Sequence, residues 1–161
     1  SRKIKSLYFE NFNEEMYQDS IEGTVPRKKI RIRNYPDDKN LLLYLEVKIS
    51  SADGRYKTRK IIDEKKFNDI KQEGIYDNQY GTCMPLIYVT YNRQYYQVED
   101  VRISIDENIK YQLFSGRELG SDNNSIVELK ASINKDRDNL LNDFPFQRTR
   151  FSKYCNAFEK I

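Results

Sequence analysis

The ten residues from Pro26 to Tyr35 constrain this chain more than any other stretch of its sequence. Because side chains alternate between the two faces of a strand, this segment carries a row of cations on one face: Arg27, Lys29, Arg31 and Arg33. The opposite face has an apolar centre made of isoleucines. Like charges on one face repel one another, and burying each of them unpaired would be costly. The cationic face must therefore contact water, carboxylates or a polyanion.

The length and composition indicate one folded domain. A chain of 161 residues is long enough to bury a real core. Its 33% charged residues do not indicate disorder, because 13 tyrosines and 8 phenylalanines are available for packing. No signal peptide is visible, and no apolar run approaches the ~20 residues that a membrane span needs. The net charge of +3 is modest, so the placement of charges matters more than their total.

Cysteine and histidine usage narrows the possible chemistry. Cys83 and Cys155 lie far apart and show no CxxC spacing, which predicts free thiols in a reducing, cytoplasmic compartment. The chain has no histidine, which excludes serine-type triads, histidine-ligated zinc and the usual general base. Any metal would be held by carboxylates, and such ligands favour Mg or Mn.

Alternation of apolar and polar residues recurs along the chain and predicts a sheet-rich fold. We expect strands at Ile4–Glu10, Leu41–Ser50, Arg55–Ile62, Leu86–Tyr95, Val101–Asp106, Ile109–Phe114 and Ile126–Ser132. We expect helices at Glu14–Ile21 with Asn13 as the cap, Asp63–Glu73, Lys135–Asn142 and Phe151–Ile161. Residues 75–84 and 116–125 are expected to be loops.

The charged strand faces are compatible with two arrangements. In a sandwich they point to bulk solvent, and the apolar faces form the core. In a closed barrel they line a polar interior, and amphipathic helices cover the apolar outer wall. The residues alone leave both arrangements open, and the solvated face is the commoner of the two.

Several short motifs resemble a known family when they are taken together. They occur in this order: Leu7-Tyr8-Phe9-Glu10-Asn11, Lys29-Ile30-Arg31-Ile32-Arg33, Leu45-Glu46-Val47-Lys48, Tyr91-Asn92-Arg93, Val101-Arg102-Ile103-Ser104-Ile105-Asp106, Val127-Glu128-Leu129-Lys130 and Phe151-Ser152-Lys153-Tyr154. Each motif alone is weak, but their order is informative and spans nearly the whole chain. The chain resembles the VTC domain, the polyphosphate polymerase domain of the vacuolar transporter chaperone family, in the form of its bacterial relatives. That domain belongs to the CYTH-like group of triphosphate tunnel metalloenzymes.

The resemblance implies an α+β fold, in which an antiparallel β-barrel has a basic lumen and helices packed outside. Residues 1–161 would form a single domain that lacks a strand found upstream in the family. The implied activity is metal-dependent phosphotransfer, in which the γ-phosphate of ATP is added to a polyphosphate chain with Mn or Mg as the ion. The implied partners are ATP, polyphosphate or inorganic triphosphate.

Site residues follow from motif positions and from charge. The expected catalytic residues are Arg31, Arg33, Arg150 and Lys153. The expected substrate-binding residues are Arg31, Arg33, Lys48, Arg59, Arg93, Arg102 and Lys130, of which Arg59 and Lys130 supply general electrostatic lining. The expected metal ligands are Glu128 and, as a second candidate, Glu46. Simpler roles stay open, namely solvated arginines, an Arg93 stacked on tyrosine, carboxylates in cross-strand ion pairs and a surface lysine at Lys153.

Other functions also stay open. A non-catalytic polyphosphate or nucleotide-binding module would use the same arginines without a metal, and a triphosphatase would have the same fold. A nucleic-acid binder is disfavoured, because carboxylates lie among the arginines and the net charge is small. The sequence does not determine the oligomeric state.

Overall fold

The computed structural model describes residues 1–131 and 146–161 of the chain. The described residues form one antiparallel sheet of nine strands, with strand order β4-β3-β2-β1-β6-β7-β8, while β5 also pairs with β6 and β9 with β7. The strands are β1 (Arg2–Asn11), β2 (Arg27–Asn34), β3 (Leu43–Ser51), β4 (Gly54–Ile62), β5 (Ile75–Asp77), β6 (Gly81–Val98), β7 (Val101–Leu113), β8 (Glu118–Asp122) and β9 (Ile126–Lys130). The helices are α1 (Glu15–Glu22), α2 (Glu64–Glu73) and α4 (Lys153–Phe158).

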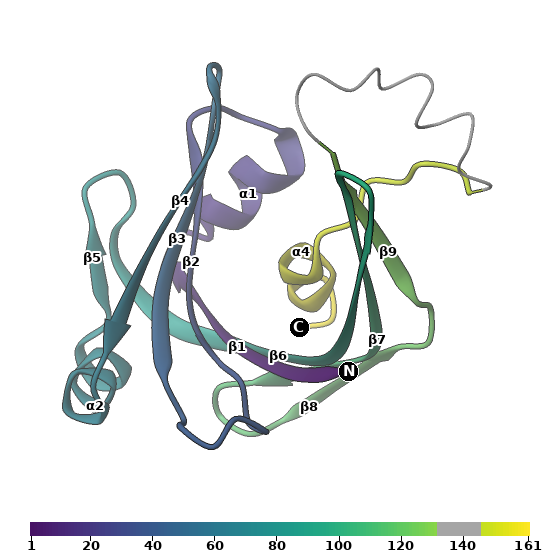
Figure 1. Ribbon diagram of the computed structural model, residues 1–161. Coiled ribbons are helices and arrows are strands. Elements are labelled where there is room, and N and C mark those ends of the chain that lie inside the picture. Colours follow the sequence, from purple (N-terminus) through teal and green to yellow (C-terminus); the bar gives the residue numbers. More distant parts are fainter. Residues whose placement is uncertain (132–145) are drawn as a thin grey trace.

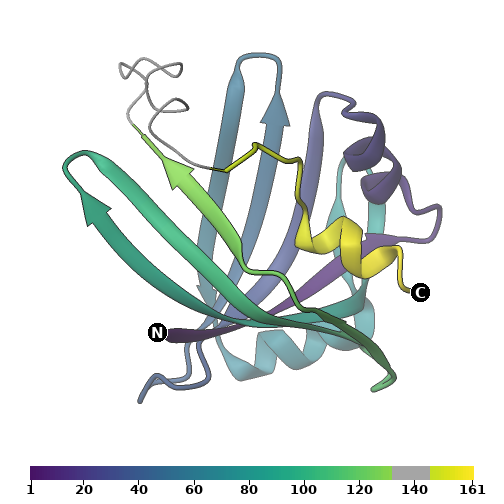
Figure 2. The ribbon, with the colours of Figure 1, turned by 90° about the vertical axis from the view of Figure 1, so that its right-hand side faces the viewer.

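The sheet is strongly curved, and the helices lie on different sides of it. Helix α4 lies inside the curve, between the arm formed by β2, β3 and β4 and the arm formed by β7 and β9, whereas α2 lies outside (Figure 1). The side view confirms that α4 lies against the concave side (Figure 2). Register shifts interrupt the β1–β6, β6–β7 and β7–β8 pairings, and such bulges bend and twist a sheet. We call the side that packs on α4 the inner face and the opposite side the outer face.

The outer face is apolar and is covered in part by α2. Leu7, Phe9 and Ile32 are buried there together with Ile70 of the helix. The side chain of Asp63 caps the helix by accepting the amide of Lys66 at 2.7 Å, as the sequence predicts.

Gly74 ends α2 and allows a close approach between the helix and β6. Its φ is +80°, and a Cβ atom at this position would lie 2.7 Å from the carbonyl oxygen of Cys83. A glycine is therefore required both by the backbone conformation and by the lack of space.

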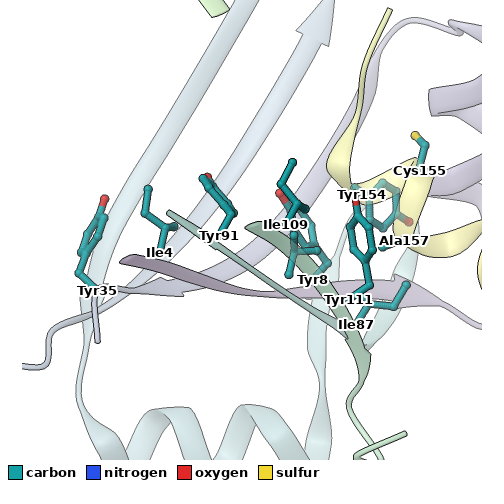
Figure 3. Packing of buried hydrophobic residues seen from close by; sticks show 11 residues of the cluster. Ile4, Tyr8, Tyr35, Ile87, Tyr91, Ile109, Tyr111, Tyr154, Cys155 and Ala157 are labelled. Atoms are coloured by element: carbon teal, nitrogen blue, oxygen red, sulfur yellow. The ribbon is translucent and has the colours of Figure 1, made fainter. Parts of the chain in front are cut away.

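The inner face has a second core, which is rich in tyrosine. It includes Tyr8, Tyr91 and Tyr111 from the strands and packs against Tyr154 and Ala157 of α4 (Figure 3). The rings of Tyr8 and Tyr154 have centroids 5.3 Å apart. This core holds α4 in the middle of the curved sheet.

The start of α1 differs from the prediction that Asn13 caps the helix. The N-cap is Glu14, whose φ is +60° and whose side chain makes no capping bond. Instead, the buried carboxylate of Glu10 accepts the amides of Met16 at 3.1 Å and Tyr17 at 2.9 Å, and it also accepts the hydroxyl of Tyr154. Glu10 therefore ties β1 to both α1 and α4.

Two of the expected loops contain strands. The first includes β5 and the start of β6, which pair with each other between Ile75 and Cys83. The second includes β8, which pairs with β7. The strands expected at Val101–Asp106 and Ile109–Phe114 form one strand, β7, with Asn108 at a φ of +54° inside it. The helix expected at Lys135–Asn142 lies outside the described residues.

The prediction of a closed barrel with every helix outside is wrong in two respects. Among the described residues, β4 does not pair with β8 or β9, so the sheet stays open. Helix α4 lies inside the curve of the sheet, where the prediction placed an open lumen, rather than outside it (Figure 1). Within this part of the chain, no helix is long and apolar enough to span a membrane. Both cysteines are free, as predicted, and both are buried.

Candidate functional site

The strand register gathers most of the predicted site residues on the inner face. Arg31 pairs with Glu46, and Glu46 pairs in turn with Arg59. On the other arm, Arg102 of β7 lies opposite Lys130 of β9. The alternation read from β2 is confirmed, because its isoleucines are buried on the outer face while its arginines contact inner-face residues.

Glu46 is the centre of the first charged cluster. Its side chain is 1% exposed, and its Oε2 accepts from Arg31 Nε at 2.8 Å and Nη2 at 2.6 Å. Its Oε1 lies 3.3 Å from the Lys57 ammonium and 3.4 Å from the Arg59 guanidinium. Burial alone would raise the pKa of Glu46, but the charges of Arg31 and Arg33 lower it to about 2. Since cations hold both oxygens, the geometry supports the ion-pair role for Glu46 rather than metal binding.

Arg33 is buried and is held by hydroxyl groups. Its Nε donates to Ser6 Oγ at 3.0 Å, and its Nη2 donates to the Tyr91 hydroxyl at 3.0 Å. Arg33 as a whole residue is 7% exposed. Among the described residues, no carboxylate forms a salt bridge with Arg33, and its charge is therefore not neutralised by an ion pair there.

The pKa values of two neighbouring groups report this excess of positive charge. Burial alone would raise the pKa of Tyr8, but the charges of Arg31 and Arg33 lower it to about 7. Lys48 is accessible to solvent, yet the surrounding protein partly desolvates its ammonium. This desolvation and the charge of Arg31 lower the pKa of Lys48 to about 8. The lowered pKa of Tyr8 is the shift expected at a site with positive potential, and at Lys48 the charge of Arg31 adds to the larger effect of desolvation.

The two arms of the sheet face each other across the site. The negative charge of Glu128, on β9, raises the pKa of Lys48, on β3, although burial and Arg31 outweigh it. This interaction joins β3 to β9, two strands that do not pair and that belong to different arms of the sheet. The charged residues of both arms therefore form one site rather than two separate surfaces.

Asp106 is the centre of the second charged cluster and was not predicted as a site residue. It is 1% exposed and accepts from Arg93 Nε at 2.5 Å and Nη2 at 2.7 Å. The ammonium of Lys153, at the start of α4, donates to the same carboxylate at 2.5 Å. Burial would raise the pKa of Asp106, but these two cations lower it. The one signal for Asp106 in the sequence was the alternation along β7, which places it on the same face of the strand as Arg102.

Glu128 is the accessible carboxylate of the site. Its side chain is 47% exposed, and its Oε1 lies 3.5 Å from the Lys130 ammonium. Its Oε2 lies 3.9 Å from Arg93 Nη2. These are loose contacts, and they leave carboxylate oxygens free to meet a ligand that enters from solvent.

The structure separates Arg150 from Lys153. Lys153 contacts Asp106, whereas the Arg150 guanidinium donates to the backbone carbonyl of Ser20 at the end of α1. Lys29 lies close to the start of α4, where its ammonium contacts the Oγ atom of Ser152, the N-cap residue, at 2.8 Å. Of the predicted catalytic residues, Arg31, Arg33 and Lys153 lie on the inner face, whereas Arg150 contacts α1.

The carboxylates of the site limit how it could hold a metal. No group of three or more histidine, cysteine, aspartate or glutamate side chains in residues 1–131 and 146–161 is placed to bind an ion. Glu46 and Asp106 are each held by cations. Glu128 is therefore the carboxylate that fits, as a single protein ligand to an ion that is otherwise coordinated by water and substrate oxygens.

The fold and the site define a class of protein: a curved, open antiparallel sheet whose concave face carries buried arginines around a central helix. The chain belongs to the VTC domain family, whose model matches residues 1–80 and 75–161. No curated protein matches the sequence.

Two solved structures have a similar fold. The PH1819 protein of Pyrococcus horikoshii OT3 is 18% identical, with a TM-score of 0.61, over 100% of this chain and 87% of that one. A Bacillus halodurans protein proposed to be an adenylate cyclase is 10% identical, with a TM-score of 0.51, over 80% of this chain. The matched region spans 63% of the Bacillus protein. At these identities, the likeness establishes the fold alone.

Proposed function

We propose that the inner face binds a linear chain of phosphate groups, such as polyphosphate, inorganic triphosphate or the triphosphate of ATP. The observation that carries this proposal is Arg33, a buried guanidinium that is held by the hydroxyls of Ser6 and Tyr91 and by no carboxylate among the described residues. A buried cation without a direct ion-pair partner is costly. An anionic ligand on this face would remove that cost.

The chemistry of the surrounding groups fits phosphate. Arginine binds phosphate oxygens through two parallel hydrogen bonds, which a lysine cannot form. Hydroxyls hold Arg33 without neutralising its charge, and the Tyr8 hydroxyl holds Arg31 beside its ion pair with Glu46. Lysines around them add charge on both arms. A flexible chain of phosphates can meet several of these cations at once.

Binding is tested by titrating the protein with tripolyphosphate in a calorimeter at two salt concentrations. The proposal predicts binding that weakens as salt rises, because exposed charges are screened. Lys48→Ala, on the inner face, should weaken binding severalfold. Lys60→Ala is the matched control, because Lys60 pairs with Leu45 on the outer face. Equal effects of the two substitutions, or no binding by the wild type, would contradict the proposal.

We further propose that the site transfers the γ-phosphate of ATP to the end of a polyphosphate chain. A terminal oxygen of the acceptor chain would bond to the γ-phosphorus, the bond from that phosphorus to the β–γ bridging oxygen would break, and ADP would leave. Such a reaction depends on positioning and on neutralising charge. Membership of the VTC domain family supports this proposal, as does the accessible Glu128 close to Arg93. Glu128 would hold Mg or Mn, which supplies charge stabilisation at the phosphates.

Activity is tested by incubating the protein with ATP and Mn²⁺ and separating the products on a gel. Long-chain phosphate would support transfer, whereas orthophosphate released from tripolyphosphate would identify a triphosphatase of the same fold. Glu128→Gln should abolish the long-chain product while tripolyphosphate still binds in the absence of metal. Tight binding without any product would leave a non-catalytic binding module and would exclude the transfer reaction.

A further inference from the structure

Three side chains outside the two charged clusters meet where β2 passes the start of α4. The Lys29 ammonium donates to Ser152 Oγ at 2.8 Å and lies 3.9 Å from the sulfur of Cys155. Lys29 and Cys155 are 126 residues apart in the sequence, and they meet because α4 lies inside the curved sheet (Figure 1). An amine and a thiol from two distant elements therefore form one cluster.

Lys29 has no strong partner that would hold it in its charged form. In the part of the chain that the structure describes, no carboxylate forms a salt bridge with its ammonium, whereas Asp106 holds Lys153. The centroid of the Tyr154 ring lies 5.4 Å from the Lys29 nitrogen. Burial lowers the pKa of Lys29, so the neutral amine is more abundant than for a lysine in water. The neutral amine is the form that attacks electrophiles.

Cys155 is the more reactive of the two cysteines by its surroundings. It is 6% exposed, and its sulfur points away from the ring of Tyr111 (Figure 3). Cys83 is 0% exposed, and its sulfur contacts the backbone carbonyl of Gly81. Burial raises the pKa of Cys83 to about 12, which keeps this thiol protonated and inert. Only Cys155 has an ammonium beside its sulfur among the described residues, so we expect a small oxidant to react there.

We propose that oxidation by a peroxide joins Cys155 to Lys29 through a covalent sulfur–nitrogen bond. First, hydrogen peroxide transfers one oxygen to the Cys155 sulfur; the O–O bond breaks, the sulfur is oxidised to a sulfenic acid, and one water is released. The lone pair of the Lys29 nitrogen then attacks that sulfur, and the S–O bond breaks. The hydroxyl leaves as a second water with a proton from the amine. A dithiol reverses the reaction, since it restores the thiol and the amine and becomes a disulfide.

This bond would change both the charge and the stability of the inner face. The nitrogen of a sulfenamide is far less basic than an amine, so the row of cations on β2 loses the charge of Lys29. The bond also ties β2 to α4, and it closes a loop of 126 residues. A crosslink across such a loop should raise the melting temperature by roughly 5–15 °C. The inference does not depend on the proposed phosphate-binding function.

The test treats the reduced, whole chain with a small excess of hydrogen peroxide and follows it by intact mass and peptide mapping. The wild type should lose the mass of two hydrogen atoms. The map should contain one peptide with Lys29 linked to one with Cys155, and dithiothreitol should separate them. Lys29→Arg keeps the positive charge but not the nucleophilic amine, so its Cys155 should stay a sulfenic acid that dimedone labels.

Two control variants identify the atoms that are joined. Cys83→Ser should link as the wild type does, which excludes a disulfide between the two cysteines as the source of the lost hydrogens. Lys28→Arg should also link, because Lys28 is the neighbouring lysine but its ammonium contacts Asp77 at 2.8 Å instead.

The wild type alone can refute the proposal, even if Lys29→Arg does not fold. A Cys155 that gains two oxygen atoms as a sulfinic acid, that stays labelled by dimedone without a link, or that does not react would contradict it. A link to another lysine would also contradict it, and a linked pair that retains one oxygen between nitrogen and sulfur would refute the direct bond. The same loss of two hydrogens in Lys29→Arg would exclude Lys29 as the partner. A linked product that melts no higher than the reduced chain would refute the tie between β2 and α4.

Discussion

Glu46→Gln is the substitution that most clearly separates stability from ligand binding in this protein. The amide is close in shape to the carboxylate, but it has no negative charge. Arg31, which donates two hydrogen bonds to the Glu46 carboxylate, is then buried without a counter-ion. Breaking a buried ion pair by removing one partner costs about 3–5 kcal/mol. The lowering of the Glu46 pKa from 4.5 to about 2 gives a similar value, about 3 kcal/mol. For a chain of this length, the melting temperature should fall by roughly 6–20 °C.

The pH dependence gives this prediction a second check. The folded pKa of Glu46 lies below its unfolded value, so the stabilisation is fully present above pH 4.5 and is lost as the pH falls toward 2. The difference in unfolding free energy between wild type and Glu46→Gln should therefore be largest near neutral pH and shrink through this window. Urea denaturation followed by circular dichroism at pH 6.5 and pH 3 measures it.

Glu46→Gln should weaken the fold but strengthen the binding of tripolyphosphate. Glu46 competes with an anionic ligand for Arg31, Lys57 and Arg59, so the substitution should tighten tripolyphosphate binding and increase the stabilisation that the ligand provides. Glu73→Gln, at the exposed end of α2, is the control and should change neither property. The reasoning is refuted if Glu46→Gln stays within about 1 kcal/mol of the wild type at neutral pH, or if it weakens tripolyphosphate binding.

Three further predictions follow from individual contacts. The folded pKa of Tyr8 is about 7, below its ordinary value of 10. The free energy of unfolding of the wild type should therefore rise by roughly 1–3 kcal/mol relative to that of Tyr8→Phe between pH 7 and pH 10, as measured by urea titrations. A difference that stays constant with pH would contradict the lowered pKa. Asp106→Asn should destabilise the fold by about 3–5 kcal/mol and reduce hydrogen-exchange protection in α4, because Lys153 loses its partner; unchanged protection would show that this contact does not anchor α4. Gly74→Ala should lower the melting temperature more than Gly81→Ala, because both glycines have positive φ but only Gly74 lacks space for a Cβ atom; equal losses would assign the effect to φ alone.

The local structure of the strands could be predicted from the sequence because alternation depends on neighbouring residues only. The period of two along Lys29–Arg33 correctly places arginines on one face and isoleucines on the other. The cap of α2 was equally local, since Asp63 contacts an amide three residues away. These features follow from backbone geometry and need no knowledge of the fold.

The position of α4 could not be predicted in the same way. The spacing of Phe151, Tyr154, Cys155 and Phe158 indicates a buried helix face but not which face of the sheet covers it. The outcome depends on Glu10 and Asp106, which bind Tyr154 and Lys153 from strands far away in the sequence. The role of Asp106 was missed for the same reason, because its partner Arg93 is set by a strand register that contains a bulge.

The most direct test of the central claim is a crystal structure of this protein grown with tripolyphosphate. The account predicts a phosphate chain on the inner face, with oxygens within hydrogen-bonding distance of the Arg31 and Arg33 guanidiniums and of Lys153. A chain bound on the outer face, or one that touches only exposed lysines while Arg33 keeps Ser6 and Tyr91 as its sole partners, would contradict it.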